Sequence, residues 1–322
     1  MKNIAIIAGG YSSEYEVSLK SAENLYSVMD KSKYNLYIVV LHKKSWTVKL
    51  PDGSTPVIDK NDFSFLVSGQ KIKIDYAYIT IHGNPGEDGR LQGYFDMLDI
   101  PYSSCGVLAG ALTFNKFFNN QFLKSMGIRV SDSIRITEGE KVEDENIINR
   151  LGLPIFVKPN DGGSSFGVSK VKDASQLQPA IEKAFAEGNE VIIERFIKGT
   201  EITCGCYKTK TKQVVFPITE VVTENEFFDY NAKYNGEVQE ITPARISAEI
   251  TSEIQQETLK IYDLIGARGI IRIDYIIPDD NNPVLLEINT TPGMTATSFI
   301  PQQIRAAGLD IKDVMSDIIE NC

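Results

Sequence analysis

Apolar and polar stretches alternate along the first third of the chain in a way that predicts a parallel sheet flanked by helices. Three short apolar runs are typical of buried strands, at 3–8, 36–41 and 75–81. Gly9-Gly10 opens a turn after the first run, and a helix is expected from Ser12 or Ser13. Strands that alternate with helices form parallel sheets, which bind ligands at the carboxyl ends of their strands.

The rest of the chain continues as two further units of helices and strands. After helical spacing over 107–126, a second unit from near Ser131 has a strand at 155–159, a helix near 174–187 and a strand at 191–196. A third unit from near Gly199 has the strands EITCGCY and QVVFPI and helices near 247–265 and at 310–320. The pattern favours an α/β protein of several domains.

The segment from about Thr219 to Pro243 has no clear helical or strand periodicity. Loops of this length in a compact domain are usually disordered or functional. Its aromatic residues distinguish it from a disordered linker: Phe227, Phe228, Tyr230 and Tyr234. We therefore expect an ordered lid.

Two apolar runs near the end of the chain, RGIIRIDYII and PVLLEIN, carry polar residues within a hydrophobic context. Strand side chains alternate between two faces. One face of the first run holds Ile270, Arg272, Asp274 and Ile276. One face of the second holds Leu285, Glu287 and Asn289. The turn PDDNNP between the runs predicts an antiparallel hairpin.

The register of this hairpin brings two carboxylates together. If Ile277 pairs with Val284, Asp274 lies opposite Glu287. Facing carboxylates repel, and a divalent cation between them would reverse that effect. With Asn289 they form an oxygen-only set that suits Mg²⁺, completed by substrate phosphates. A solvated surface hairpin is the alternative, although the flanking Ile and Leu residues argue against it.

Composition narrows the class of protein. The 322 residues, 42% hydrophobic and 24% charged, are ordinary for a soluble globular protein of two or three domains. A formal charge of −10 argues against a nucleic-acid groove or an anionic membrane surface as partner. No apolar stretch approaches a membrane span, and the start MKNIAIIAGG is too short for a signal peptide.

The four cysteines, at 105, 204, 206 and 322, have neither disulfide-framework nor zinc spacing. Cys204 and Cys206 share one face of a predicted strand and are expected in the core. Free thiols fit a reducing, cytoplasmic location.

The loop KPNDGGSSFGVSK has the composition of an anion-binding loop. Its glycine N–H groups and the hydroxyls of Ser164 and Ser165 suit oxyanions, and Lys158 directly precedes them. The loop matches neither a Walker A nor a GxGxxG pattern. A plain hairpin turn is the alternative, but Lys116, Lys233 and the carboxylate pair together favour phosphate binding.

The segment ERFIKGTE suits a nucleoside. Phe196 and Ile197 can supply apolar walls, and Glu194 or Glu201 a carboxylate for ribose hydroxyls. A strand edge with a capped turn explains the same residues equally well.

Glu14 and His82 each have a structural and a functional interpretation. A glutamate at a helix start commonly stabilises the helix dipole, but Glu14 can also anchor a substrate ammonium. A lone histidine after a strand is more often structural than catalytic. Its place at a strand end, beside Gly83 and Gly86, favours a functional role for His82.

Taken together, these motifs resemble the D-alanine–D-alanine ligase family of the ATP-grasp superfamily. The resemblance rests on Lys116 and on GGYSSEYEVSL, HGNPGEDGRLQG, VKPNDGGSSFGV, IERFIKGTE, FFDYNAKY, RIDYII and LLEINTTPGMTATS. These motifs occur in the order of the family and span nearly the whole chain. GEDGRLQG, DYNAKY and EINTTPGMT in one chain are a highly specific combination.

The resemblance implies a three-domain ATP-grasp architecture. A Rossmann-like, parallel α/β domain is expected at 1–104. Two α+β domains, at 105–194 and 195–322, are expected to clasp ATP, with the lid near 219–243. The resemblance also implies a cytoplasmic homodimer.

The implied reaction has two steps and serves peptidoglycan precursor synthesis. The carboxylate of one D-alanine attacks the γ-phosphate of ATP and forms an acyl phosphate, whose carbonyl the amine of a second D-alanine then attacks. Two Mg²⁺ ions, for which Mn²⁺ can substitute, are implied as cofactors. The alternatives are another ATP-grasp carboxylate–amine ligase, a D-Ala-D-lactate ligase, or a nucleotide-binding regulator without catalysis.

The resemblance also implies roles for individual residues. ATP would be contacted by Lys116, Lys158, Ser164, Ser165, Glu194, Ile197, Glu201, Lys233 and Asn289. The metal ligands would be Asp274, Glu287 and Asn289. The first D-alanine and the reacting carbonyl would be contacted by Glu14, His82, Ser164, Tyr234, Arg272 and the Gly293 N–H, of which Arg272 and Gly293 form the oxyanion site. The second D-alanine carboxylate would be contacted by Ser298 and the backbone of Phe299.

Tyr234 bears on the second substrate. In the family, tyrosine at this lid position goes with peptide formation and phenylalanine with D-lactate use. We therefore expect D-alanyl-D-alanine as product, and expect Tyr234→Phe to change the preference between D-alanine and D-lactate.

Overall fold

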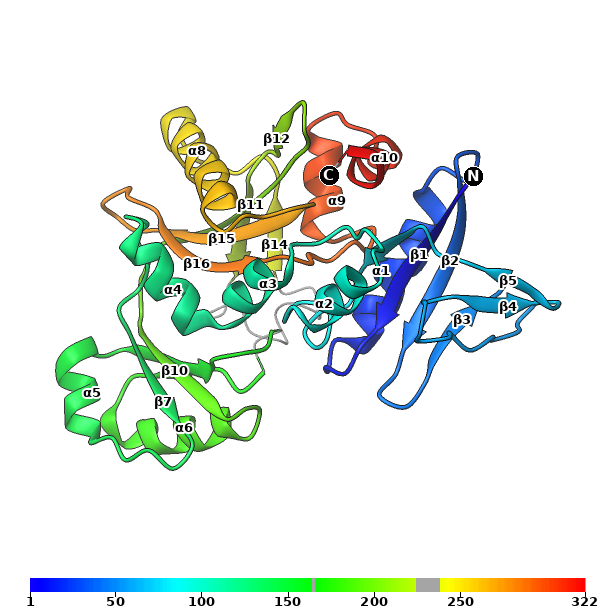
Figure 1. The fold of residues 1–322 in the computed structure, drawn as a ribbon. Coiled ribbons are helices and arrows are strands. Elements are labelled where there is room, and N and C mark those ends of the chain that lie inside the picture. Colours follow the sequence, from blue (N-terminus) through cyan, green and yellow to red (C-terminus); the bar gives the residue numbers. More distant parts are fainter. Residues whose placement is uncertain (164–165, 224–237, 322) are drawn as a thin grey trace.

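Three sheets contain most strands of the structure, a computed structural model that describes residues 1–163, 166–223 and 238–321. Figure 1 shows the N-terminal part on the right, a green middle part at the lower left and the C-terminal sheet above it. The predicted α/β class is confirmed. Within the described ranges, no helix is both long and apolar enough to cross a membrane.

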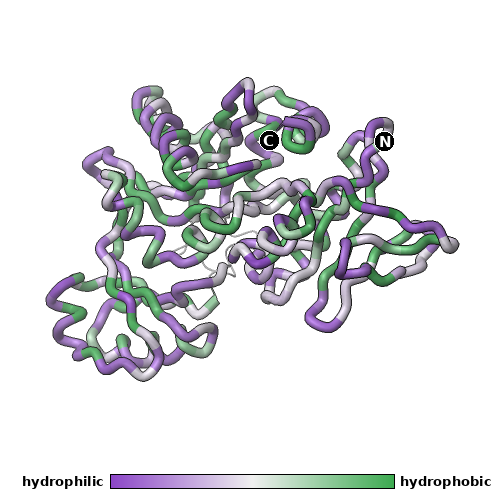
Figure 2. Tube along the Cα trace, in the orientation of Figure 1, coloured by the Kyte–Doolittle hydropathy of each residue, from purple (hydrophilic) through white to green (hydrophobic). Residues whose placement is uncertain are grey.

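The N-terminal sheet is parallel except at one edge, in the order β3-β2-β1-β6. Its parallel strands are β1 (Lys2–Gly9), β2 (Tyr34–Leu41) and β6 (Tyr76–Ile79), and its antiparallel edge is β3 (Trp46–Lys49). A separate hairpin pairs β4 (Phe65–Val67) with β5 (Gln70–Ile72). In Figure 2 the strands of this sheet are largely hydrophobic and the loops at its outer edge hydrophilic. The predicted parallel order thus holds, while β3 and the small hairpin were not expected.

The turn after β1 requires its two glycines. Gly9 and Gly10 have φ angles of 89° and 99°, which L side chains rarely adopt. A Cβ on Gly10 would lie 2.5 Å from Ile81. Helix α1 (Tyr15–Val28) then begins two or three residues later than expected, with Glu14 at its N-cap.

The middle sheet is antiparallel throughout. Its order is β7 (Ser133–Thr137), β10 (Glu190–Arg195), β8 (Ile155–Pro159) and β9 (Ser169–Val171). Its helical elements are α5 (Asp144–Leu151), η1 (Ala174–Gln176) and α6 (Leu177–Phe185). The apolar sides of α5 and α6 form one core cluster with β8 and β10.

Three helices connect the N-terminal and middle parts: α2 (Arg90–Met97), α3 (Val107–Phe114) and α4 (Lys116–Ser125). The continuous helical spacing expected over 107–126 is therefore broken at Asn115, whose backbone is extended. The side chain of Asn115 caps α4 by accepting a hydrogen bond from the N–H of Phe118 at 3.0 Å. An asparagine at this place competes with the helix through its own side chain.

The C-terminal sheet has the order β14-β13-β11-β15-β16, and β12 pairs with β11. The strands are β11 (Thr200–Lys208), β12 (Gln213–Val215), β13 (Thr219–Thr223), β14 (Val238–Ile241), β15 (Ile271–Ile277) and β16 (Val284–Asn289). The helices are α8 (Ala248–Leu264), α9 (Phe299–Ala306) and α10 (Ile311–Asn321). Cys204 and Cys206 are buried in the core cluster between this sheet and α8, as predicted.

The expectation of an irregular segment over 219–243 is wrong at both ends of that segment. They form β13 and β14, which pair antiparallel from Glu220–Ile241 to Thr223–Val238. These strands are too short for a clear period-2 pattern. Pairing stabilises them, β13 with β11 and β14 with β13. The centre of the expected lid, 224–237, lies outside the described residues.

Candidate active site

The hairpin of β15 and β16 holds the central charges of the site. Asp274 pairs with Glu287, as predicted, and Arg272 pairs with Asn289. The predicted pairing of Ile277 with Val284 is wrong, because the register shifts after Asp274 and Val284 pairs with Ile276. One extra residue in a strand reverses the alternation of side chains beyond it.

This β-bulge changes which leucine faces the site. Leu285 lies in the hydrophobic core, not on the face of Glu287 as expected. Leu286, the extra residue, lines the cavity beside Glu287 instead. Sequence alternation alone does not reveal such an insertion.

Arg272 neutralises the charge of Asp274. Its Nε and one terminal nitrogen each donate to a different oxygen of Asp274 at 2.8 Å. Asn289 Nδ2 adds a third hydrogen bond at 3.1 Å. Burial opposes the charge of Arg272, but Asp274 outweighs it and holds the arginine pKa above its usual range. The repulsion expected between Asp274 and Glu287 is thus offset within the hairpin.

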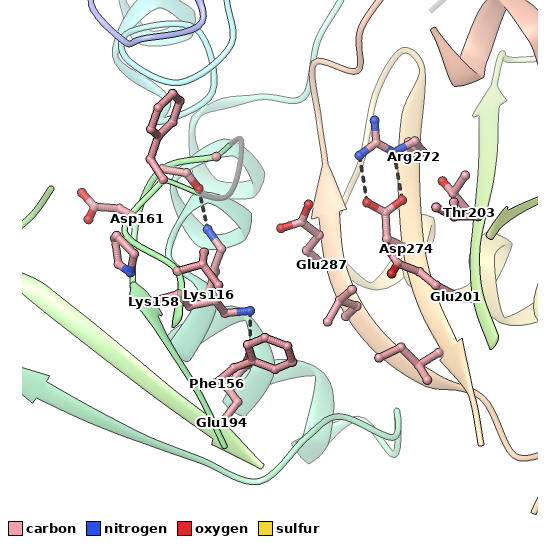
Figure 3. Close-up of a pocket in the computed structure, with 18 of the residues that line it drawn as sticks. Lys116, Phe156, Lys158, Asp161, Glu194, Glu201, Thr203, Arg272, Asp274 and Glu287 are labelled. Atoms are coloured by element: carbon pink, nitrogen blue, oxygen red, sulfur yellow. Dashed lines mark hydrogen bonds and ion pairs between the residues drawn. The ribbon is translucent and has the colours of Figure 1, made fainter. Parts of the chain in front are cut away.

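A cavity of about 910 Å³ lies in front of this hairpin. Figure 3 shows Arg272, Asp274 and Glu287 on one wall and Lys116 and Lys158 on the facing wall. The predicted site residues that line it are Glu14, Lys116, Lys158, Glu194, Ile197, Glu201, Arg272, Asp274, Glu287 and Phe299. Residues far apart in the sequence are therefore brought to one cavity.

The two lysines occupy different electrostatic environments. Lys116 Nζ donates to the carbonyl of Gly162 at 2.5 Å, and burial lowers its pKa. Lys158 Nζ forms an ion pair with Glu194 Oε2 at 2.6 Å. Burial opposes the charge of Lys158 as well, but Glu194 outweighs it and raises the lysine pKa. Lys158 is therefore firmly cationic, whereas an anionic ligand would favour the charged form of Lys116.

The glycine-rich loop lies against the N-terminal part. A Cβ on Gly163 would lie 3.0 Å from Oε2 of Glu14. Glycine therefore permits the close approach of the loop to this carboxylate. The site combines groups from the N-terminal, middle and C-terminal parts.

Four predicted residues within the described ranges are not part of the cavity wall: His82, Asn289, Gly293 and Ser298. His82 is buried, and its carbonyl accepts a hydrogen bond from Ser12 at 2.7 Å. The hydroxyl of Ser298 hydrogen-bonds that of Thr295 at 2.7 Å. Ser164, Ser165, Lys233, Tyr234 and Cys322 lie outside the described residues.

Glu87 was not predicted from the sequence as a site residue. Burial raises its pKa to about 8, and Glu14 adds to the effect by repulsion. A hydrogen bond from the Gly83 N–H at 2.7 Å partly opposes the shift. The motif GEDG contains this glutamate, but only the fold shows its proximity to Glu14.

Thr203 is the second residue of the site that was not predicted from the sequence. It lines the cavity, is 2% exposed and pairs with Asp274 across β11 and β15. Its hydroxyl has no hydrogen-bond partner among the described residues. The alternation of EITCGCY does place it opposite the core cysteines, but the neighbouring strand could not be assigned from sequence.

The carboxylates fit a hard cation only together with a substrate. Among the described residues, no group of three or more His, Cys, Asp or Glu side chains could hold a metal ion. Two facing carboxylates with the nearby amide of Asn289 suit Mg²⁺ when substrate phosphates supply further oxygens. The donor set therefore fits the predicted ion.

Two antiparallel sheets that enclose a cavity, with lysines on one wall and carboxylates on the other, define an ATP-grasp enzyme. Models of the D-Ala-D-Ala ligase N-terminus and C-terminus match residues 3–105 and 122–320. The chain belongs to the D-alanine–D-alanine ligase family.

Individual relatives are similar over nearly their whole length. A D-alanine–D-alanine ligase of Parabacteroides distasonis is 68% identical, with 99% of this chain and 97% of the relative covered. The VanG D-Ala:D-Ser ligase of Enterococcus faecalis has a TM-score of 0.86 at 30% identity, with 99% and 98% covered. The D-alanine–D-alanine ligase of Bacillus anthracis complexed with ATP has a TM-score of 0.79 at 30% identity, with 99% and 96% covered.

Proposed function

We propose that this chain ligates two D-alanine molecules to D-alanyl-D-alanine with ATP, through a D-alanyl phosphate, for peptidoglycan precursor synthesis. The observation that carries the proposal is the cavity in which Lys116 and Lys158 face Arg272, Asp274 and Glu287. Phosphoryl transfer requires positioning and charge neutralisation more than covalent participation of the protein. Opposed cationic and anionic walls supply both.

The lysine wall is proposed to bind the nucleotide. Lys116 and Lys158 would neutralise phosphate oxygens, with Lys233 as a third cation. Glu194, Ile197 and Glu201 would contact adenosine, and the serines of the glycine-rich loop the phosphates. The assignment is supported by the cavity that all five line: Lys116, Lys158, Glu194, Ile197 and Glu201.

The hairpin wall is proposed to hold the reacting groups. Arg272 would stabilise the oxyanion of the tetrahedral intermediate together with the Gly293 N–H. Asp274, Glu287 and Asn289 would hold Mg²⁺, or Mn²⁺ in its place, which supplies charge neutralisation at the phosphates when bound.

The N-terminal part and α9 are proposed to bind the amino acids. Glu14 would accept the ammonium of the first D-alanine, near His82, with Ser164 and Tyr234 hydrogen-bonded to Glu14. Ser298 and the backbone of Phe299 would bind the second carboxylate at the start of α9, where the helix dipole favours an anion.

Larger-scale features complete the proposal. We propose domain boundaries at 1–104, 105–194 and 195–322, a lid within 219–243, a homodimer and a cytoplasmic location. Size-exclusion chromatography with light scattering tests the dimer, and a monomer at micromolar concentration would contradict it.

The activity test measures phosphate release from ATP with D-alanine, L-alanine, D-lactate or D-serine as sole co-substrate, and identifies products by mass spectrometry. We expect release with D-alanine alone among these, and D-alanyl-D-alanine as product. The similarity to a D-Ala:D-Ser ligase makes D-alanine plus D-serine a necessary further mixture. Absence of release with D-alanine would reject the proposal.

A further inference from the structure

Asn120 of α4 contacts a carboxylate of the proposed nucleotide site. Its Nδ2 donates to Glu194 Oε1 at 3.0 Å, and both residues are buried, at 2% and 4% exposure. The second oxygen, Oε2, forms the ion pair with Lys158. Two donors from two elements, α4 and β8, therefore hold one oxygen each.

These contacts determine the orientation of Glu194 and place a cation against it. A carboxylate held at both oxygens cannot rotate without breaking a buried hydrogen bond. The raised pKa of Lys158 keeps the lysine of this ion pair charged. An ionised carboxylate only accepts hydrogen bonds, and each oxygen keeps a further acceptor position.

The surroundings of Glu194 suit a planar base. Phe156, Phe196 and Ile197 line the same cavity, and the rings of Phe156 and Phe196 lie 5.8 Å apart in an edge-to-face arrangement. Figure 3 shows Phe156 beside Glu194 and Lys158. Apolar walls with one oriented acceptor can distinguish bases by the hydrogen-bonding groups at their edges.

We propose that Asn120 is a positioning residue that orients Glu194 as an acceptor and thereby selects a 6-amino purine over a 6-oxo purine. This inference rests on the proposed binding of ATP in this cavity. A 6-amino group donates to the carboxylate, whereas a 6-oxo group would place two acceptors against each other. Without Asn120, Glu194 can turn away and leave Lys158 to donate to the 6-oxo group.

A purely structural role for Asn120, in which it only joins α4 to β10, makes a different prediction. Loss of such a joint would lower stability or affect all nucleotides equally. Asn119 provides the matched control, because it is adjacent, of the same type and also 2% exposed. Its amide oxygen has no hydrogen-bond partner among the described residues, and Glu194 Oε1 accepts from Asn120 instead.

The experiment compares kcat/KM for ATP and inosine triphosphate in the full chain with saturating D-alanine. We expect the ratio of kcat/KM for ATP to kcat/KM for inosine triphosphate to fall at least about tenfold in Asn120→Ala. This is the scale of a hydrogen bond to a charged group. Asn119→Ala should leave the ratio unchanged. An unchanged ratio in Asn120→Ala, or an equal fall in both variants, would overturn the proposal.

A variant of the same size gives a second test. In Asn120→Asp, two buried carboxylates would face each other, and one would take up a proton. The protonated new side chain would donate to Glu194 Oε1 as Asn120 does, so the kcat/KM of ATP relative to inosine triphosphate should stay near the wild-type value at pH 6. This ratio should fall at pH 8, where both carboxylates are ionised and repel each other. A pH-independent ratio equal to that of the wild type would contradict this expectation.

Calorimetric binding separates this inference from the proposed ligase activity. ADP and inosine diphosphate are compared without turnover, so base selection is measured even if D-alanine is not the substrate. If the wild type prefers ADP and Asn120→Ala loses this preference, the role of Asn120 is supported independently of the ligase activity. If the variant keeps the preference for ADP, the role of Asn120 is rejected, while the proposed ligase activity is not affected.

Discussion

Arg272 and Asp274 form a pair whose charges compensate each other before any ligand binds. Both are nearly buried, and two hydrogen bonds of 2.8 Å join them. A buried pair contributes little net stability, but removal of one partner leaves the other charge unpaired. The residues proposed for catalysis therefore also determine whether the hairpin is stable.

Arg272→Met should lower both activity and stability. We expect kcat to fall roughly 10²- to 10³-fold through loss of an oxyanion donor. The free energy of unfolding should fall by about 3–5 kcal/mol, because Asp274 keeps an uncompensated charge. Guanidinium unfolding and ADP release measure the two effects.

The double variant Arg272→Met/Asp274→Asn is the control for this prediction. It removes both charges and should recover most of the lost stability, without recovery of activity. Equal instability of the single and double variants would show that packing, and not the unpaired charge, caused the loss.

Glu87 makes stability depend on pH. Its pKa of about 8 in the folded chain exceeds its ordinary value of 4.5, so the folded state binds the proton more tightly. Its contribution to stability is therefore complete below about pH 4.5 and is lost as pH rises through about 8. The cause is burial, with repulsion from Glu14 added.

Glu87→Gln removes this titration. We expect the melting temperature of the variant, relative to the wild type, to be higher at pH 9 than at pH 5. Differential scanning fluorimetry across this range measures the difference between the two proteins. A constant difference would mean that Glu87 has an ordinary pKa in the folded chain.

At the level of secondary structure, the side chain of Gln303 hydrogen-bonds α9 to the C-terminal sheet. Gln303 is fully buried and accepts from the Gly205 N–H at 3.0 Å. Its amide donates to the Thr203 carbonyl at 3.0 Å and to the Thr219 hydroxyl at 3.1 Å. The helix proposed to bind the second D-alanine is thereby positioned on β11 and β13.

Gln303→Leu should lower the free energy of unfolding by about 3 kcal/mol, since it leaves buried backbone groups of β11 without partners. It should also raise the KM for D-alanine more than the KM for ATP. The neighbouring Gln302→Leu is the control, because Gln302 is more exposed, and its change should stay within about 1 kcal/mol. Chemical unfolding with steady-state kinetics measures both effects, and similar losses in the two variants would refute the role of Gln303.

At the scale of the whole molecule, the N-terminal part contacts the segment that leads into β15. Arg268 donates to the Tyr102 hydroxyl at 2.8 Å, and its guanidinium lies 5.0 Å from the centre of that ring. Gly269 follows with a φ of 68°, and a Cβ there would lie 1.7 Å from the Ser103 carbonyl. This close approach links the N-terminal part to the charged hairpin.

Gly269→Ala should therefore destabilise the chain severely. The clash is with backbone, which must shift, so we expect a loss above about 4 kcal/mol. Gly266→Ala is a matched control with a φ of 62° and no atoms within 4 Å, for which strain of about 1 kcal/mol is expected. Thermal unfolding of both variants distinguishes a clash from backbone strain. Equal losses of stability would contradict the close contact of Gly269 with the Ser103 carbonyl.

Local patterns predicted several details because each depends on near neighbours. Gly9-Gly10 and the burial of Cys204 and Cys206 follow from turn chemistry and strand alternation. The pairing of Asp274 with Glu287 was predicted correctly because the wrong pairing at the turn and the unrecognised bulge cancel each other. The break at Asn115 and the bulge at Leu286 depend on one residue each and interrupt otherwise regular patterns. Such interruptions are weak sequence signals.

The sequence by itself determined the chemical inventory: an oxygen-rich hairpin, a glycine-rich loop with its lysine, and motifs that indicate one family. Only the tertiary structure decided which of these groups share a cavity and what charge each carries. Glu87 acquires its raised pKa, and Glu194 its orientation, from residues distant in the sequence. Burial and long-range pairing control both properties, and neither is a property of the local chain.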